Sequence, residues 1–134
     1  MNGLEAVAAV ATRLRSQVPG RTVYEHGVPD GALPARYVVV FGSEGDEAAT
    51  RACGTTNVQE PSVWVTSVSR NPDGHNAARE AAWGASRGRT ALRDYRPEGR
   101  WKFTPASSSP ARRDEALSDT TFYAVEQFTL RSTI

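Results

Sequence analysis

The sequence predicts a single α+β domain over residues 1–134: a mostly antiparallel sheet of about five strands packed against two helices, with two long polar loops. The chain is long enough to enclose one buried core. Two segments carry apolar residues at helical spacing, and short β-branched runs follow each of them. An order of helix, three strands, helix and two strands is typical of helices packed on an antiparallel sheet.

The first half begins with a predicted amphipathic helix that ends before Pro19-Gly20. Its apolar stripe is Leu4, Val7, Ala8, Ala11, Leu14 and Val18. Residues 21–26, RTVYEH, then predict a short strand, and residues 36–42, RYVVVFG, predict a second one after a turn-rich connection. Because the run from Val38 to Phe41 is apolar on both faces, this strand is expected near the centre of the sheet, with a helix over at least one face.

The middle of the chain combines a long polar stretch with a strand and a helix. Residues 43–60 are long for a connection within a domain, so they are predicted to form a mobile or functional loop. SVWVTSVS predicts the third strand, after which Asn71 or Asp73 can cap a helix over about residues 75–95. The predicted inner stripe of this helix is small: Ala78, Ala81, Ala82, Ala85, Gly88 or Arg89, and Leu92. Small side chains would let the helix approach the sheet closely.

The last third is predicted to hold two strands separated by the second long polar loop. RWKFTP predicts the fourth strand, and residues 106–119 predict the loop. TTFYAVEQFTLRS predicts the final strand, with a candidate bulge near Glu126.

Charge is unevenly distributed, although the net charge is only +1. Acidic residues dominate positions 25–60, and arginines dominate positions 79–113. Either copies of the chain join head to tail, each acidic face meeting a neighbour's basic face, or the two segments are unrelated solvated surfaces. The candidate interface residues on the first interpretation are Glu44, Asp46, Glu47, Arg51, Arg87, Arg89, Arg112, Arg113 and Asp114.

Three features of the sequence bear on the compartment: apolar runs, the N-terminus and the cysteine content. No apolar run approaches the roughly 20 residues of a membrane span, and the N-terminus lacks the basic leader of a signal peptide. Cys53 is the only cysteine, so an intramolecular disulfide is excluded. The cytoplasm or a particle assembled in the cytoplasm fits best, and no membrane partner is expected.

Residues 84–88, GASRG, match the G-x-S-x-G nucleophile elbow of serine hydrolases. The elbow requires a strand that leads into a sharp turn, whereas the residues before this motif have a helical pattern. Both His26 and His75 also precede Ser86, which contradicts the hydrolase order of serine, acid and histidine. We therefore predict that Ser86 is not a nucleophile and that the glycines mark a close helix–sheet contact.

Other candidate chemistry is weak, and no enzyme activity, metal or cofactor is predicted. His75 and Glu80 point about 140° apart around a helix, so capping explains Asp73 and its neighbours better than metal binding does. Nucleotide-binding glycine motifs do not occur. The arginines of the second helix, with Trp101 and Phe103, could track phosphates and stack bases, which leaves a small nucleic-acid-binding module as an alternative.

Three stretches of the chain resemble a known family. They are VYEHGVPDGALPARYVVVFG, SVWVTSVSRNPDGHNAAREAAW and SSSPARRDEALSDTTFYAVEQFTLRS. Together with the order of elements, they resemble the small tail terminator proteins of long-tailed bacteriophages, particularly those that infect high-GC hosts. The likeness covers most of the chain. It lies in the order of the elements and in their residue patterns, not in a catalytic signature.

The resemblance implies a structural role in the virion at the junction of tail and neck, after assembly in the host cytoplasm. Such proteins form a homohexameric ring on the last ring of the tail tube, stop its polymerisation and present a docking surface for the head connector. The implied partners are copies of this chain, the major tail tube protein and a neck protein, without specific nucleic acid, although DNA can pass through such a ring. Arg112 and Arg113 would then lie in a partner-contact loop, and another neck or head-closure protein is the alternative.

Overall fold

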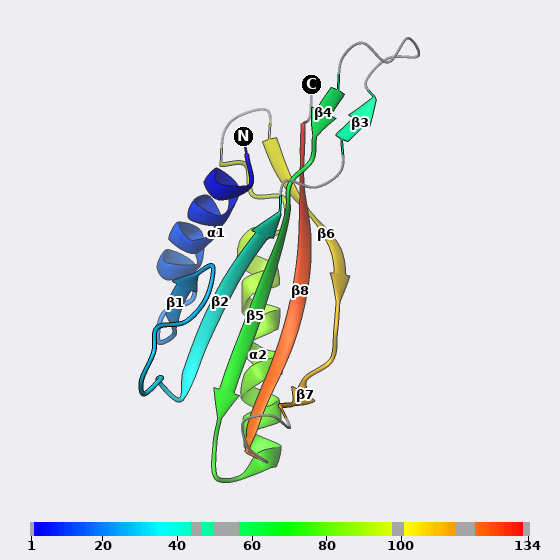
Figure 1. Ribbon diagram of the computed structural model, residues 1–134. Helices are drawn as coiled ribbons and strands as arrows, with labels where there is room; N and C mark the ends of the chain where they lie inside the picture. The colour runs from blue at the N-terminus through cyan, green and yellow to red at the C-terminus, as the bar shows by residue number, and fades with distance from the viewer. Residues whose placement is uncertain (1, 44–46, 50–56, 98–100, 115–119, 133–134) are drawn as a thin grey trace.

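The computed structural model describes residues 2–43, 47–49, 57–97, 101–114 and 120–132 (Figure 1). The first half contains, in order, α1 (Gly3–Gln17), β1 (Thr22–Glu25), β2 (Arg36–Ser43), β3 (Glu47–Ala49) and β4 (Asn57–Gln59). The second half contains β5 (Ser62–Arg70), α2 (Gly74–Leu92), β6 (Trp101–Ser108), β7 (Arg112–Arg113) and β8 (Thr121–Ser132). The predicted α+β class is confirmed.

The main sheet has the strand order β1-β2-β5-β8-β6, and the short β7 also pairs with β8. Its sixth strand, β7, lies beyond the five that the sequence predicts. Strand β1 runs parallel to β2, because the connection over residues 26–35 returns along the length of β1. All other neighbouring pairs in this sheet are antiparallel, as expected. As predicted, β2 is an inner strand, between β1 and β5.

Both helices pack on one face of the sheet, α1 mainly against β1 and β2, and α2 against β5 and β8 (Figure 1). The sheet contributes large side chains to this core: Val38, Val40, Val63, Val65, Phe103, Phe128 and Leu130. On the opposite face, a smaller cluster forms around Tyr37, Val39 and Val68, which Leu33 of the β1–β2 connection partly covers. The apolar run in β2 therefore has partners on both of its faces.

Helix α1 begins at a capping box, in which Asn2 and Glu5 each accept a hydrogen bond from the other's backbone N–H. Its buried stripe is Gly3, Ala6, Val7, Val10, Ala11 and Leu14. The predicted stripe was rotated from the true one, because Leu4 is 66% exposed and Ala8 is exposed. The true stripe extends to Gly3, Ala6 and Val10, on the side of the helix away from Leu4 and Ala8.

Helix α2 is capped by Asp73, whose side chain accepts a hydrogen bond from the His75 backbone N–H at 3.0 Å. Its buried stripe is Ala77, Ala81, Gly84, Ala85, Gly88, Ala91 and Leu92. The prediction of an unusually small inner stripe is confirmed. Two of its members were wrong, because Ala78 is half-buried and Ala82 is exposed.

The two predicted long loops contain regular structure. Within residues 43–60, β3 and β4 form a separate antiparallel hairpin beyond the ends of β2 and β5 (Figure 1). The second loop is shorter than predicted, because β6 continues to Ser108 and β7 pairs with β8. The expected bulge lies in β6, between Pro105 and Ser107, and not in β8 at Glu126. Proline lacks the N–H that continues the ladder, which accounts for an irregularity at this edge strand.

Neither described helix has both the length and the hydropathy needed to cross a bilayer.

Candidate functional site

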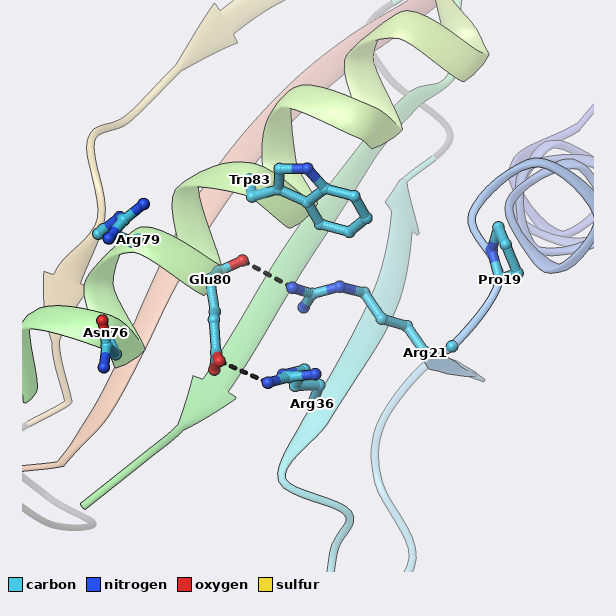
Figure 2. Close-up of a pocket in the computed structure, with 8 residues that line it drawn as sticks. Pro19, Arg21, Arg36, Asn76, Arg79, Glu80 and Trp83 are labelled. Atoms are coloured by element: carbon cyan, nitrogen blue, oxygen red, sulfur yellow. Dashed lines mark hydrogen bonds and ion pairs between the residues drawn. The ribbon is translucent and has the colours of Figure 1, made fainter. Parts of the chain in front are cut away.

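A groove of about 550 Å³ lies between the C-terminal end of α1 and the N-terminal half of α2 (Figure 2). It is lined by Pro19, Gly20, Arg21, Arg36, Asn76, Arg79, Glu80 and Trp83. We call it the arginine groove. Its walls come from the α1–β1 connection, the start of β2 and one side of α2, so only the folded chain brings these residues together.

Arg21 is the buried centre of the arginine groove. Its side chain runs beneath α2, where Nη2 donates to the Glu80 carbonyl at 2.6 Å and Nη1 donates to Ser69 Oγ at 3.3 Å. Arg21 is only 9% exposed, and this burial lowers the pKa of its guanidinium. Its Nε has no hydrogen-bond partner among the described residues.

Gly84 makes the position of Arg21 sterically feasible. A Cβ atom at Gly84 would lie 2.7 Å from Arg21 Cζ, well inside van der Waals contact. The helix can therefore lie over the guanidinium only because this residue has no side chain. The first glycine of GASRG thus marks a close contact, but the partner is a buried arginine side chain and not, as the sequence predicted, the sheet.

Glu80 is the acidic member of the arginine groove, and Arg36 holds its charge. The two side chains form an ion pair, and Asn71 Nδ2 donates to the same carboxylate oxygen at 3.5 Å. The hydrogen bond from Arg36 lowers the pKa of Glu80 and raises the pKa of Arg36. Glu80 is therefore ionised near neutral pH.

Trp83 forms an exposed wall of the arginine groove, with 51% of its surface accessible. The guanidinium carbons of Arg21 and Arg87 lie 5.5 and 5.4 Å from the centre of its ring, within cation–π range. Arg79, on the same helix, is exposed and makes no hydrogen bond or ion pair to any other described residue. Since Arg21, Arg36 and Arg79 face a single glutamate, the lining carries three positive charges against one negative charge, an excess of two.

The predicted interface residues on α2 lie in different environments. Arg87 is exposed beside Trp83. Arg89 instead lines a second cavity of about 180 Å³ between α2 and the β6–β7 connection, together with Glu126. Burial raises the pKa of Glu126, an effect that the positive charge of Arg89 partly offsets. The two arginines therefore do not form one continuous basic patch.

The other predicted interface residues are partly placed. Arg112 and Arg113 are exposed on β7, paired with Tyr123 and Phe122 of β8. Asp114 follows β7 and is half-buried, and its backbone N–H donates to the Thr121 carbonyl. Glu47 belongs to β3. Three other predicted interface residues, Glu44, Asp46 and Arg51, lie outside the described residues, as does Cys53.

Folding also joins acidic and basic residues that the sequence separates. Glu25 pairs with Arg15 at 3.3 Å, and Glu60 pairs with Arg131 at 3.6 Å. These two contacts neutralise two carboxylates of the acidic segment, whereas the Arg36–Glu80 pair joins an arginine of the acidic segment to a glutamate of the basic one.

Two chemical alternatives lose support from the geometry. Ser86 lies within α2, as predicted, where it is exposed, and His75 is about three helical turns away. Trp101 and Phe103 are 7% and 0% exposed, so the expectation that they could stack on bases was wrong. Within the part of the chain that the structure describes, no cluster of three metal-binding side chains occurs.

The sequence analysis missed most of the arginine groove, in particular Arg21, Arg36 and Trp83. One signal was present: Trp83 is a large aromatic residue that lies off the small inner stripe of an alanine-rich helix. The position of Arg21 could not be found in this way, because it depends on where α2 crosses the strand that follows Pro19-Gly20.

No family model matches the sequence, and no curated protein matches it. Among solved structures, the fold is similar to that of a chain in the virion of a native gene transfer agent particle, with a TM-score of 0.64 and 22% sequence identity. The alignment covers 97% of this chain and 94% of that chain. The two chains therefore share one fold along almost their whole lengths.

Proposed function

We propose that this chain is a structural virion protein, a tail terminator that forms a ring, most simply a homohexamer, on the end of the tail tube. The observation that supports it is the fold shared with a chain of a gene transfer agent virion across 97% of this chain. The three stretches that resemble phage tail terminators point to the same class. The likeness extends over almost the whole chain and not over a short fragment that many folds contain.

A ring requires each subunit to offer two different surfaces, one to each neighbour. This chain has distinct features at different places: the arginine groove beside α2, the β3–β4 hairpin beyond the main sheet and the exposed arginines of β7 (Figure 1). The hairpin strands pack mainly against each other and little against the main sheet. Such features suit contacts between subunits.

In the proposed mechanism, no bond is made or broken at any side chain. The ring binds the last ring of tail tube protein and covers the surface on which another tube ring would assemble. Its outer side then provides the docking surface for the head connector. The protein would reside at the junction of tail and neck, after assembly in the host cytoplasm.

The direct test is the length of tail tubes that polymerise in the presence of the purified chain. A terminator gives short tubes capped at one end in negative-stain images, whereas tubes without it continue to grow. A neck or head-closure protein, the alternative within the same class, leaves tube length unchanged and binds the head connector. Unchanged tube length and the absence of this chain from tube ends would contradict the terminator function.

The exposed arginines of β7 offer a variant for the same assay. Arg112→Glu combined with Arg113→Glu should abolish capping, while circular dichroism stays that of the parent because both side chains are exposed. Arg93→Glu, an exposed arginine just beyond α2, is the matched control and should cap normally. Normal capping by the double variant would remove β7 from the partner contact.

A further inference from the structure

We propose that an exposed row of side chains on α2 binds the β1–β2 connection of a neighbouring copy of this chain. The row consists of Arg79, Trp83 and Arg87, and we call it the α2 stripe. The connection over residues 26–35 is called the β1–β2 loop. The inference rests on the proposed ring, for which it names the contact between adjacent subunits.

The α2 stripe combines an apolar ring with two positive charges. Its members are spaced four residues apart, so they lie one above the other on the helix surface. All three are exposed, and Trp83, which also forms a wall of the arginine groove, has 51% of its surface accessible (Figure 2). Neither arginine forms an ion pair with another described residue. Tryptophan and arginine are enriched among the residues that contribute most to the affinity of protein interfaces.

The β1–β2 loop carries the complementary groups. Val28 is one of four large apolar side chains that are exposed among the described residues, with 44% of its surface accessible. Asp30 is also exposed, and its carboxylate forms no hydrogen bond or ion pair with another described residue. In the proposed contact, Val28 covers the ring of Trp83 and Asp30 accepts hydrogen bonds from a guanidinium beside it. Guanidinium groups bind carboxylates through two parallel hydrogen bonds, so arginine suits this contact.

Both ends of the β1–β2 loop are anchored within its own chain. At the first end, the His26 N–H donates to the Val40 carbonyl at 2.8 Å. At the second end, the Ala35 carbonyl accepts from the Arg70 N–H at 2.7 Å, and Arg70 Nη2 donates to the Leu33 carbonyl at 3.4 Å. Because the ends are already ordered, binding through the middle of the loop costs less conformational entropy than binding through a free segment.

Strand addition, another route by which sheets associate, is obstructed at both edges of the main sheet. On the edge strand β1, Arg15 donates to the Val23 carbonyl at 2.9 Å. On the edge strand β6, the backbone N–H and C=O of Phe103 both bond to the segment that follows α2, and Pro105 has no N–H to donate. Blocked edges of this kind prevent sheets from pairing edge to edge. Contact between copies is therefore expected through side chains and loops.

The α2 stripe and the β1–β2 loop lie on opposite sides of the main sheet. α2 packs on one face of the sheet, and the stripe lies on the exposed side of this helix (Figure 1). The loop is anchored on the other face, where Leu33 packs on the cluster around Tyr37 and Val39. The contact therefore joins two copies through different surfaces, and repeating such a heterologous contact produces a ring when the rotation closes.

A protein loop fits the α2 stripe better than a nucleic acid does, although charge alone does not separate them. The ionised Glu80, next to the stripe, opposes an incoming carboxylate and an incoming phosphate alike. The stripe has two unpaired cations, whereas strong DNA binding commonly uses about six to ten phosphate contacts. The two aromatic residues of β6 that could have stacked on bases, Trp101 and Phe103, are buried. Binding to DNA is therefore an outcome that would contradict the proposal.

The test uses the full chain with substitutions on either side of the contact. The stripe variant changes three exposed side chains of α2: Arg79→Glu, Trp83→Ala and Arg87→Glu. The loop variant changes two exposed side chains: Val28→Ser and Asp30→Arg. Sedimentation velocity, with and without preformed tail tubes, measures self-association. Each variant should weaken it at least about tenfold, about 1.4 kcal/mol.

The matched control is Arg93→Glu, an exposed arginine just beyond α2 and outside the stripe. It should associate as the parent does, and all variants should keep the parent's circular dichroism. If the control weakens association as much as the stripe variant does, the effect comes from net charge and the proposed contact is wrong.

Mixing the stripe and loop variants tests the pairing itself. The stripe variant retains an intact loop, and the loop variant retains an intact stripe, so the mixture should form dimers that grow no further. Monomers in the mixture would overturn the proposal, because one complementary pair of surfaces would be present without binding. Continued growth to rings would overturn it as well.

The remaining outcomes separate this inference from the proposed function. If the parent forms rings and both variants still form them, the contact between stripe and loop is wrong while the ring stands. If the parent remains monomeric even with tail tubes present, both proposals fail. If the stripe variant loses only salt-sensitive retention on DNA and associates normally, the stripe is a nucleic-acid site and the inference is wrong.

Discussion

The layer between the sheet and its helices has two ends of different character. The apolar end, below α1 and the C-terminal part of α2, receives four large side chains from β5 and β8: Val63, Val65, Phe128 and Leu130. The polar end, below the N-terminal half of α2, receives four small or polar residues from the same two strands: Ser67, Ser69, Ala124 and Glu126. The difference lies in the side chains alone, because the strands continue through both ends.

The comparison explains where the candidate site lies. Burial of large apolar side chains stabilises the fold at the apolar end. At the polar end, the small residues of α2 leave room for Arg21, which lines the arginine groove. Arg89, in the last turn of α2, lines the second cavity together with Glu126 of the polar end. The arginine groove therefore lies over the polar end, which is the part of the core that contributes least to apolar packing.

The two ends should differ most in how much the free energy of unfolding falls when a buried side chain is truncated. Phe128→Ala should lower the free energy of unfolding by about 3–5 kcal/mol, because it leaves a cavity in the fully buried core. Ser67→Ala at the polar end should be neutral or stabilising, since its buried hydroxyl has no partner among the described residues. Urea denaturation followed by tryptophan fluorescence measures both. Similar losses in the two variants would contradict the comparison.

The two glycines of GASRG sharpen the comparison within one helix. A Cβ at Gly84 would collide with the guanidinium of Arg21, whereas a Cβ at Gly88 would meet Leu14 and Val65 at 3.7 and 3.9 Å, ordinary contacts. Gly88→Ala should therefore stabilise the protein by up to about 1 kcal/mol through helix propensity. Gly84→Ala should be about 1–2 kcal/mol less stable than Gly88→Ala, because Arg21 must move away from Ser69 and the Glu80 carbonyl. Thermal unfolding of the two variants checks the difference, and equal stability would show that Arg21 relocates freely.

The sequence predicts the class of fold well because hydrophobic periodicity is strong in both helices and in β2, β5 and β8. It misplaces the details of α2 because alanine is compatible with both buried and exposed positions. Ala78 and Ala82 therefore could not be distinguished from Ala77 and Ala85 by residue type. The rotation of the helix is decided by where its small residues meet Arg21 and β5.

The candidate site is less predictable because it depends on contacts between distant segments. Spacing alone groups Arg87 with Arg89, but two residues apart on a helix point in different directions. Arg21 and Glu80 are 59 positions apart in sequence and meet only after α2 has packed on the sheet. Similarly, nothing in residues 43–60 indicates that β3 and β4 pair with each other and not with the main sheet.

A smaller effect should appear as pH dependence at the polar end. Burial raises the pKa of Glu126, so the folded protein holds this proton more tightly than the unfolded chain does. Stability should therefore fall as the pH rises from about 4.5, the ordinary value, through the raised pKa of the folded state. Glu126→Gln should lack this decline, which urea denaturation at a series of pH values would show. Parallel profiles for parent and variant would mean that Glu126 does not titrate above its ordinary range.

The smallest expected effect concerns Glu80, whose shift has the opposite sign. The hydrogen bond from Arg36 lowers the pKa of this carboxyl, so its contribution to stability is present above the ordinary pKa and is lost as the pH falls through the lowered one. Arg36→Gln should change stability little at neutral pH, because the arginine is exposed. It should raise the pKa of Glu80 toward its ordinary value, as measured by NMR titration of the carboxyl. If that pKa does not move, Asn71 and Arg21 hold the carboxylate instead, and Arg36 adds its charge to those available for an acidic partner.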